Sequence, residues 1–165
     1  SGDALAVITT LETPVQGCKI ISLGSMDYVA VASPELYQAH FSDGVSLEAL
    51  RGCVAIAFNR KDTIQDQWMA LCFGGTVPLS IHYVPSYEGY LSCCLNGAGW
   101  GLVPSIAGMP YVKRGELVEL SPGKKVSVAL HWQAGMQSSE ILSRLGNLVL
   151  DVAREHLTPD RFRPD

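Results

Sequence analysis

Short apolar runs alternate with stretches of helical periodicity from one end of the chain to the other. The apolar runs that predict strands are rich in β-branched residues and stop at Gly, Pro or polar positions: Ala4–Thr9, Lys19–Leu23, Asp27–Ala32, Cys53–Phe58, Leu79–Val84, Gly101–Val103 and Val126–Trp132. The stretches that predict helices are Pro34–His40, Leu47–Leu50, Thr63–Phe73, Tyr87–Leu95, Ser105–Arg114 and Ser138–Glu155. Such alternation is typical of an α/β domain whose strands are largely parallel.

The last predicted helix carries one apolar stripe, whose members recur at spacings of three and four: Ile141, Leu142, Leu145, Leu148, Val149 and Val152. Arg144, Asp151 and Arg154 lie outside this stripe. The pattern predicts that the helix packs its apolar stripe on a sheet. Other helices carry start signals, such as Ser33 followed by Pro34, which supply a capping hydroxyl and a proline at the first helical position.

Composition fits one globular domain. The 165 residues are 47% hydrophobic and 17% charged, which is enough apolar material for a real core. The formal net charge of −4 leaves no basic surface for a phosphate backbone, so any DNA binding would belong to another segment. No apolar run reaches the length of a membrane span, and Ser1-Gly2-Asp3 does not resemble a signal peptide. We therefore expect a cytoplasmic protein without a membrane partner.

The five cysteines do not form a pattern of metal ligands or of paired thiols. Each lies in an apolar context without CxxC spacing: Cys18, Cys53, Cys72, Cys93 and Cys94. Buried, reduced thiols are the expected state, because a free cysteine packs as a small hydrophobe. A redox switch at the adjacent Cys93 and Cys94, or a nucleophilic role for one thiol, stays open as an alternative.

Motifs for metal, nucleotide and covalent chemistry are missing from the sequence. The four histidines are scattered without HExxH or Cys/His clustering. The glycines of Gly97–Gly101 have the spacing of neither a Walker loop nor a dinucleotide fingerprint, and no Gly-x-Ser-x-Gly elbow occurs. We therefore expect no metal, no cofactor and no catalytic residues.

Several stretches, in this order and spacing, resemble the effector domains of LysR-type transcription regulators. Leu23–Pro34 resembles the strand that leaves lobe I and enters lobe II, Gly97–Pro104 resembles the family's glycine-rich strand after a helix, and Val126–Trp132 resembles the strand that returns to lobe I. The arginine- and lysine-responsive subgroup is the most similar one, through Ser33-Pro34, Phe41–Val45, Ala57-Phe58, Cys93-Cys94 and Leu120–Gly123.

This resemblance implies a two-lobed α/β fold of the type II periplasmic-binding-protein kind. Residues 1–27 and 127–165 would form lobe I, and residues 28–126 would form lobe II. The family pattern is entered only at Gly2-Asp3, so lobe I is expected to be truncated at its N-terminus. The implied function is to bind a small-molecule effector between the lobes, with a basic amino acid as the candidate. The implied partners are further copies, as a homo-dimer or tetramer, and DNA through a helix-turn-helix domain that is not in this chain.

In open α/β sheets a ligand lies at the carboxyl ends of the strands, where helices begin. The candidate ligand-binding residues lie at such ends: Thr9, Thr10, Asn59, Arg60, Asp62, Ser86, Tyr87, Glu88, Val103 and Pro104. Thr9 and Ser86 would bind a carboxylate, and Asp62 and Glu88 would meet an ammonium or guanidinium group. The structural alternatives stay open: Ser86 and Asp62 as helix caps, Glu88 as a first-turn acid, Arg60 as a solvated loop residue and Thr9 as a sheet end.

Lobe closure would occur at the two crossover strands, with Asp27, Tyr28, His131 and Trp132 as the candidate hinge residues. The same scaffold also serves enzymes and extracytoplasmic solute-binding proteins. An enzyme would need a dyad such as Cys93 with His82 or His131, or a carboxylate with a raised pKa. A solute-binding protein is disfavoured because nothing resembles a signal peptide.

Overall fold

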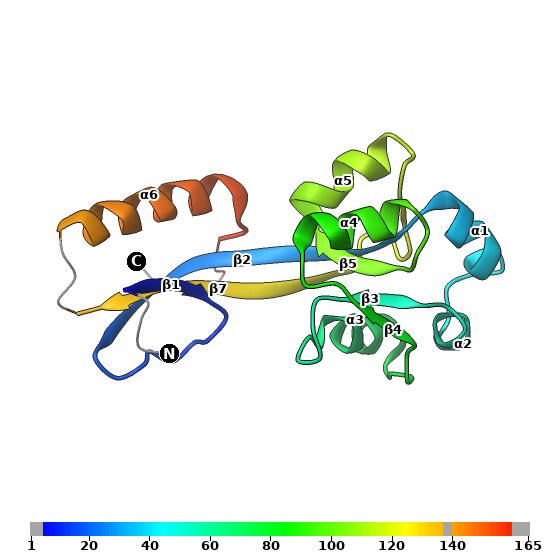
Figure 1. Cartoon of the computed structure of the whole chain (residues 1–165), viewed down its shortest axis with the longest axis horizontal. Helices are drawn as coiled ribbons and strands as arrows, with labels where there is room; N and C mark the ends of the chain where they lie inside the picture. The colour runs from blue at the N-terminus through cyan, green and yellow to red at the C-terminus, as the bar shows by residue number, and fades with distance from the viewer. Residues whose placement is uncertain (1–4, 137–139, 160–165) are drawn as a thin grey trace. The chain divides into compact units, whose positions relative to one another are not determined.

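The computed structural model describes residues 5–136 and 140–159. It divides the chain into two compact units, which are described separately here. Unit 1 combines the residues up to Asp27 with those from Ser127 onward, and unit 2 is Tyr28–Val126. The chain enters unit 2 within the long strand β2 (Cys18–Ala32) and leaves it within β7 (Lys125–Gly135). These two strands are the crossovers between the units (Figure 1).

Unit 1 is a small sheet covered on one face by a long helix. Its strand β1 (Ala6–Thr9) pairs antiparallel with β7, which is hydrogen-bonded on its other side to β2. Helix α6 (Glu140–His156) lies along this sheet (Figure 1). The core of unit 1 contains Leu23, Trp132 and Ala153, so it joins β2, β7 and α6.

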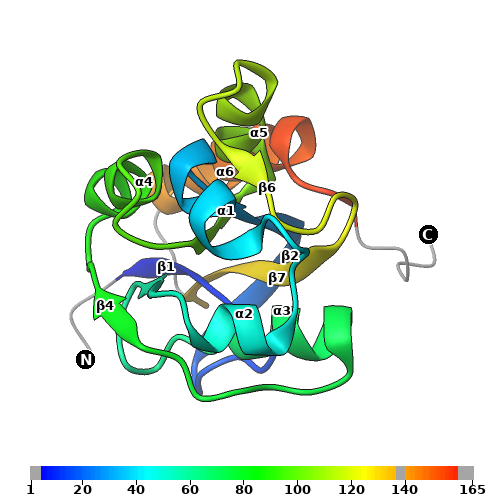
Figure 2. The ribbon, with the colours of Figure 1, turned by 90° about the vertical axis from the view of Figure 1, so that its right-hand side faces the viewer.

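Unit 2 has strands of two sheets, joined by a β-bridge between Ala55 and Trp100, between two layers of helices. Strand β5 (Gly101–Pro104) and the short β6 (Val118–Glu119) each pair antiparallel with β2, while β3 (Ala55–Ala57) and β4 (Ile81–Tyr83) pair in parallel. Its helices are α1 (Pro34–Phe41), α2 (Leu47–Arg51), α3 (Ile64–Phe73), α4 (Tyr87–Leu95) and α5 (Ser105–Lys113). Helices α4 and α5 lie on one face of the strands, and α2 and α3 lie on the other (Figure 1, Figure 2).

The core of unit 2 explains why these elements stay together. Apolar side chains of the central strands and of α4 form one cluster: Val29, Val31, Ile56, Tyr90, Cys94, Val103 and Leu117. On the α3 side, Trp68 and Trp100 are fully buried, with ring centroids 5.4 Å apart. Such large aromatic side chains contribute much of the apolar burial of a domain of this size.

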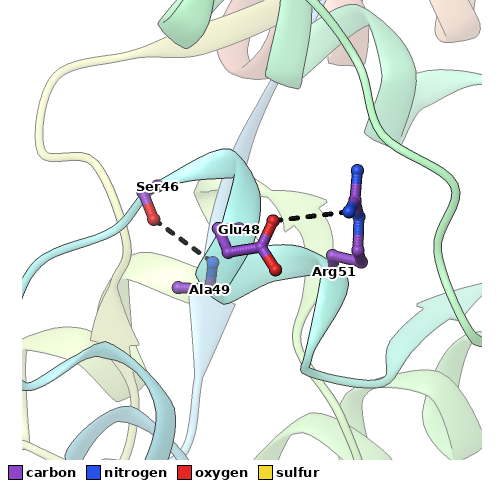
Figure 3. Close-up of polar contacts among 4 residues, drawn as sticks. All are labelled: Ser46, Glu48, Ala49 and Arg51. Atoms are coloured by element: carbon purple, nitrogen blue, oxygen red, sulfur yellow. Dashed lines mark hydrogen bonds and ion pairs between the residues drawn. The ribbon is translucent and has the colours of Figure 1, made fainter.

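Serine hydroxyls cap the first two helices, and the cap at Ser33 was predicted from the sequence. The Ser33 hydroxyl accepts a 3.2 Å hydrogen bond from the Leu36 amide at the start of α1. Ser46 accepts one of 3.2 Å from the Ala49 amide in α2, where Glu48 and Arg51 also form an exposed ion pair at 3.5 Å (Figure 3). The caps contribute about 1 kcal/mol each, whereas an exposed ion pair contributes only a few tenths of that.

Two predictions about the strands are corrected by the structure. The runs Lys19–Leu23 and Asp27–Ala32 are parts of one strand, because Gly24 stays within β2 at a φ of 103° instead of ending a strand. The expected largely parallel pairing is wrong: in the described residues it is limited to β3–β4 and a bridge between Ala55 and Trp100. Hydrophobic alternation identifies strands but carries no information about their directions.

The apolar stripe of α6 is only partly covered. Leu142 and Val149 are half-buried, as the sequence predicted, but the other members are exposed: Ile141 at 77%, Leu145 at 44%, Leu148 at 63% and Val152 at 57%. The side chains that pack on the sheet are Val149, which belongs to the stripe, and Leu150 and Ala153, which lie outside it. The first residues of the predicted helix, Ser138 and Ser139, lie outside the described residues.

Candidate ligand-binding site

The carboxyl ends of three strands meet at one edge of the unit 2 sheet. Parallel pairing places Ala57 beside Tyr83 at the ends of β3 and β4, and the parallel bridge from Ala55 to Trp100 gives β5 the same direction. Because β2 runs antiparallel to β5, Tyr28 lies opposite Pro104 at this same edge. The edge therefore gathers the loops that lead into α3, α4 and α5.

The loop after β3 is built around Asp62. The Asp62 carboxylate accepts hydrogen bonds from the Phe58 amide at 3.1 Å and from the Ile64 amide at 3.2 Å. The Asn59 side-chain oxygen accepts from the Lys61 amide at 2.8 Å. The N-cap position of α3 is Thr63, so Asp62 is not the cap residue that the sequence left open; its carboxylate instead closes the turn that leads into the helix. Asp62 is half-buried, and each carboxylate oxygen keeps a lone pair for another donor.

The start of α4 forms the neighbouring part of this edge. The Ser86 hydroxyl accepts a 3.3 Å hydrogen bond from the Gly89 amide, so Ser86 is the helix cap that was its alternative role. Tyr87 and Glu88 follow in the first turn, and both are exposed. A carboxylate near this turn would meet unpaired amides and the positive end of the helix dipole, with the Glu88 charge opposing it.

Two tyrosines at this edge, Tyr28 and Tyr87, have raised pKa values. Burial, then the negative charge of Asp62, then Tyr87 raise the pKa of Tyr28. Burial also raises the pKa of Tyr87, with a further contribution from Tyr111 of α5. Both phenols are protonated at neutral pH, as an ordinary tyrosine is, and can donate hydrogen bonds.

Arg60 is held on an aromatic ring. Its guanidinium carbon lies 5.3 Å from the ring centroid of Tyr83, at the end of β4. Such stacking contributes about 0.5–1 kcal/mol at exposed sites. Arg60 was predicted as a site residue, but Tyr83 and Tyr111 were not. The only sequence feature that could have indicated these two tyrosines is the abundance of tyrosine near strand and helix ends.

A buried network fixes the strand ends beneath the edge. The Tyr90 hydroxyl donates a 2.9 Å hydrogen bond to the Ile56 carbonyl and accepts one of 2.9 Å from the Leu102 amide. Gln65 donates to the same Ile56 carbonyl at 2.8 Å. These bonds join α3, α4, β3 and β5, so they position the loops that carry the candidate residues. No local pattern in the sequence predicts this network, because its residues are 9 to 34 positions apart.

The remaining candidates of unit 2 lie at the end of β5. Val103 is fully buried in the core, so only its backbone could border a ligand. Pro104 precedes α5 and is half-buried. Their proposed ligand contacts stay predictions.

Thr9 and Thr10 belong to unit 1. The Thr9 hydroxyl accepts a 3.1 Å hydrogen bond from the Leu11 amide, and Thr9 pairs with His131 in the sheet. Thr10 is exposed after the end of β1. Their ligand contacts also stay predictions.

The predicted hinge residues lie at or near the boundaries between the units. Asp27 and Tyr28 are the residues on either side of the first boundary, and the Ser127 hydroxyl at the second boundary donates a 2.6 Å hydrogen bond to the Asp27 carboxylate. His131 and Trp132 lie beyond that boundary, inside unit 1, where Trp132 is buried in the core. Their motion as a hinge stays a prediction. On β7, Ser127 lies at the boundary and Trp132 does not, so Ser127 is the better candidate for a hinge residue.

The cysteines are free thiols, but they are not uniformly buried as the sequence predicted. Cys53 and Cys94 are buried, whereas Cys18, Cys72 and Cys93 are half-buried. Burial raises the pKa of Cys53 to about 11 and that of Cys94 to about 12, which keeps both protonated at neutral pH. Within residues 5–136 and 140–159, no group of three or more His, Cys, Asp or Glu side chains could hold a metal ion.

The comparison with protein families decides the assignment. The model described as "LysR substrate binding domain" matches residues 2–157. The chain belongs to the LysR substrate-binding domain family. In the part of the chain that the structure describes, no helix of this LysR domain is long and apolar enough to cross a membrane.

Curated relatives of this LysR domain are named as transcriptional regulators. It is 33% identical over 159 residues to the HTH-type transcriptional regulator ArgP of Pseudomonas fluorescens, covering 96% of this chain and 53% of that protein. It is 34% identical over 163 residues to the lysine export transcriptional regulatory protein LysG of Corynebacterium glutamicum, covering 96% and 54%. The chain spans about half the length of these relatives.

Solved structures confirm the two-lobed fold and the resemblance to the arginine- and lysine-responsive subgroup. The C-terminal domains of a LysR family protein from Agrobacterium tumefaciens match with a TM-score of 0.92 and 37% identity, covering 96% of this chain and 77% of that one. Full-length LysG from Corynebacterium glutamicum with bound effector arginine matches with a TM-score of 0.80 and 33% identity, covering 96% and 54%.

Proposed function

We propose that this LysR domain is the ligand-sensing part of a bacterial transcription regulator, and that its effector is a small molecule with a basic amino acid as first candidate. One observation carries the proposal: the LysG structure that holds arginine as effector matches 96% of this chain with a TM-score of 0.80. The names ArgP and LysG of the relatives agree with it. In this proposal, unit 1 is lobe I and unit 2 is lobe II.

The unit 2 edge supplies groups for both ends of such a ligand. The first turn of α4 after Ser86 would bind the carboxylate through backbone amides. Asp62 would meet the cationic group, since its half-buried carboxylate keeps free lone pairs. The neutral phenols of Tyr28 and Tyr87 would add hydrogen bonds and aromatic surface.

In this proposal the domain binds its effector and does not convert it to a product. The ligand would bind closed lobes better than open ones, and this difference in affinity, typically about 1–3 kcal/mol, would be passed to a DNA-binding part. The proposed partners are the effector, further copies as a homo-dimer or tetramer, and DNA through a helix-turn-helix domain outside this chain. Such a regulator would act in the cytoplasm, without a membrane partner and without a catalytic residue.

A thermal-shift screen of the full-length protein against the twenty amino acids and small organic acids tests the proposal. An effector at 100 times its Kd stabilises the native state by about 2.7 kcal/mol, which is readily measured. We expect arginine or lysine to raise the melting temperature, and Asp62→Asn to reduce the rise. Glu48→Gln on the exposed α2 is the matched control and should leave it unchanged. A folded protein that responds to no compound would contradict the proposal.

A further inference from the structure

A hydrogen bond between two side chains joins the crossover strands at the boundary between the units. Asp27 is the last residue of unit 1 on β2, and Ser127 is the residue at which β7 returns to unit 1. The Ser127 hydroxyl donates a 2.6 Å hydrogen bond to Oδ1 of Asp27, although the two residues are 100 positions apart. A short bond from a hydroxyl to a carboxylate is stronger than one between neutral groups. This contact therefore ties the two crossovers together where the chain enters and leaves unit 2.

A third segment, which follows α6, reaches the same carboxylate. Thr158 forms two backbone hydrogen bonds with Ser25 of β2, of 2.8 Å and 3.0 Å, and its hydroxyl donates one of 3.4 Å to Oδ2 of Asp27. The last turn of α6 continues into this segment, because the Leu157 amide donates to the Ala153 carbonyl at 2.8 Å. The end of α6 is therefore held beside the first boundary.

Gly24 makes room for this third segment. Its backbone has a φ of 103°, and a Cβ there would lie 2.6 Å from the Thr158 carbonyl oxygen. Any other residue would require the backbone to shift, since glycine alone combines this conformation with the missing side chain. The close approach of Thr158 to β2 is thus provided for by the sequence of β2 itself.

These polar contacts lie where bending between the units would be absorbed. Hinge motions are taken up by a few residues at the ends of rigid elements. The core of unit 1 is formed by other side chains, among them Leu23, Trp132 and Ala153, so the polar contacts are not part of that core. A bond from Asp27 to Ser127 leaves each crossover less free to rotate on its own. The two strands must then bend together.

We infer that Asp27, Ser127 and Thr158 form a clasp that couples the two crossovers and so restricts the movement of one unit relative to the other. The inference builds on the lobe closure of the proposed function, but all three residues belong to unit 1 and the clasp does not involve an effector. Because Thr158 follows α6 directly, the clasp also connects the end of that helix to the boundary.

Double electron–electron resonance on the 165-residue chain, without effector, tests this inference. Spin labels attached through p-acetylphenylalanine at the exposed Lys19 of unit 1 and Glu48 of unit 2 leave the native cysteines unmodified. We expect Asp27→Ala and Ser127→Ala each to broaden the distribution of distances between the labels by about 1.5-fold or more, since either change removes the short hydrogen bond. Asp27→Asn keeps a neutral acceptor and should give an intermediate width. Asp43→Asn, in the loop after α1, is the matched control and should leave the width unchanged.

A double variant separates the clasp from unrelated effects of the two substitutions. Because Asp27→Ala and Ser127→Ala remove the same hydrogen bond, the double variant should give a distribution no broader than that of Asp27→Ala alone. Unchanged widths in both single variants would overturn the inference, as would broadening that adds up in the double variant. Circular dichroism and urea denaturation check that each variant is folded. Absence of effector binding would affect only the proposed function.

Discussion

The Tyr90 hydroxyl donates a 2.9 Å hydrogen bond to the Ile56 carbonyl, and this contact joins α4 to the end of β3 beneath the candidate site. Tyr90→Phe leaves the Leu102 amide buried without its acceptor. We expect a loss of about 1–3 kcal/mol in the free energy of unfolding, measured by urea denaturation. Tyr83→Phe removes a hydroxyl from an exposed tyrosine and should change stability by less than about 0.5 kcal/mol. Equal effects of the two variants would show that the buried network does not stabilise the edge.

Asp62 and Ser86 each accept structural hydrogen bonds and each have a proposed binding role, and substitutions can separate the two. Ser86→Ala removes the cap of α4 and is expected to cost about 1 kcal/mol of stability. Asp62→Asn keeps an acceptor oxygen for a loop amide but removes the charge, so it should weaken binding of a cationic effector by about tenfold or more. Calorimetric titration together with urea denaturation separates the two effects. Unchanged affinity in both variants would show that the effector binds elsewhere.

Buried thiols should be slow to react. Since burial raises the pKa of Cys53 to about 11 and that of Cys94 to about 12, their thiolate forms are scarce at neutral pH. We expect iodoacetamide to label both roughly 100-fold or more slowly in the folded protein than after unfolding, as resolved by peptide mass spectrometry. Rapid labelling of either thiol in the native protein would revive the nucleophile or redox alternative.

The same shifts set an alkaline limit on stability. Both folded-state pKa values lie above the ordinary value of 9.0, so the unfolded thiols ionise first as the pH rises. The stabilisation from neutral burial is complete below about pH 9 and is lost as the pH rises through the folded-state values. The free energy of unfolding should therefore fall above about pH 9, and Cys94→Ala should reduce that fall.

Because Gly24 has no side chain, Thr158 can pair with Ser25 in β2. A Cβ at this position would lie 2.6 Å from the Thr158 carbonyl oxygen, in a backbone with a φ of 103°. Gly24→Ala is expected to cost about 3 kcal/mol or more, because backbone atoms must shift. Gly17→Ala is the matched control, since Gly17 has a φ of 82° but no atom within 4 Å of its Cβ, and should cost only about 1–2 kcal/mol. Thermal denaturation of the two variants measures the difference.

Local signals were sufficient to predict most elements. The predicted helix Tyr87–Leu95 agrees with α4 to the residue, because Ser86 and the glycine after Asn96 bracket an uninterrupted periodic run. Strand direction and the continuity of β2 through Gly24 could not be predicted, since both depend on partners distant in sequence. The exposure of Leu148 was missed for the same reason: periodicity shows which side chains share a face, but not what covers that face.

The candidate site was predictable where a single loop or helix start carries it. Asp62 and Ser86 were found because they precede helices; the structure makes Ser86 the cap of α4, whereas Asp62 lies one residue before the cap position of α3 and closes the turn there. Tyr28 was considered only as a hinge residue, yet it shares its environment with Asp62 and Tyr87. Such a cluster combines a crossover strand with two loops, so only the fold could bring it together.

Calorimetric titration of arginine into the full-length protein, with the ligand analysed by chromatography afterwards, tests the central claim most directly. We predict saturable binding at one site per chain, a Kd that Asp62→Asn raises, and arginine recovered unchanged. A folded protein that gives no heat with arginine or lysine would contradict the assignment of a basic amino-acid effector. Conversion of the ligand to a product would contradict the claim that this domain is a receptor.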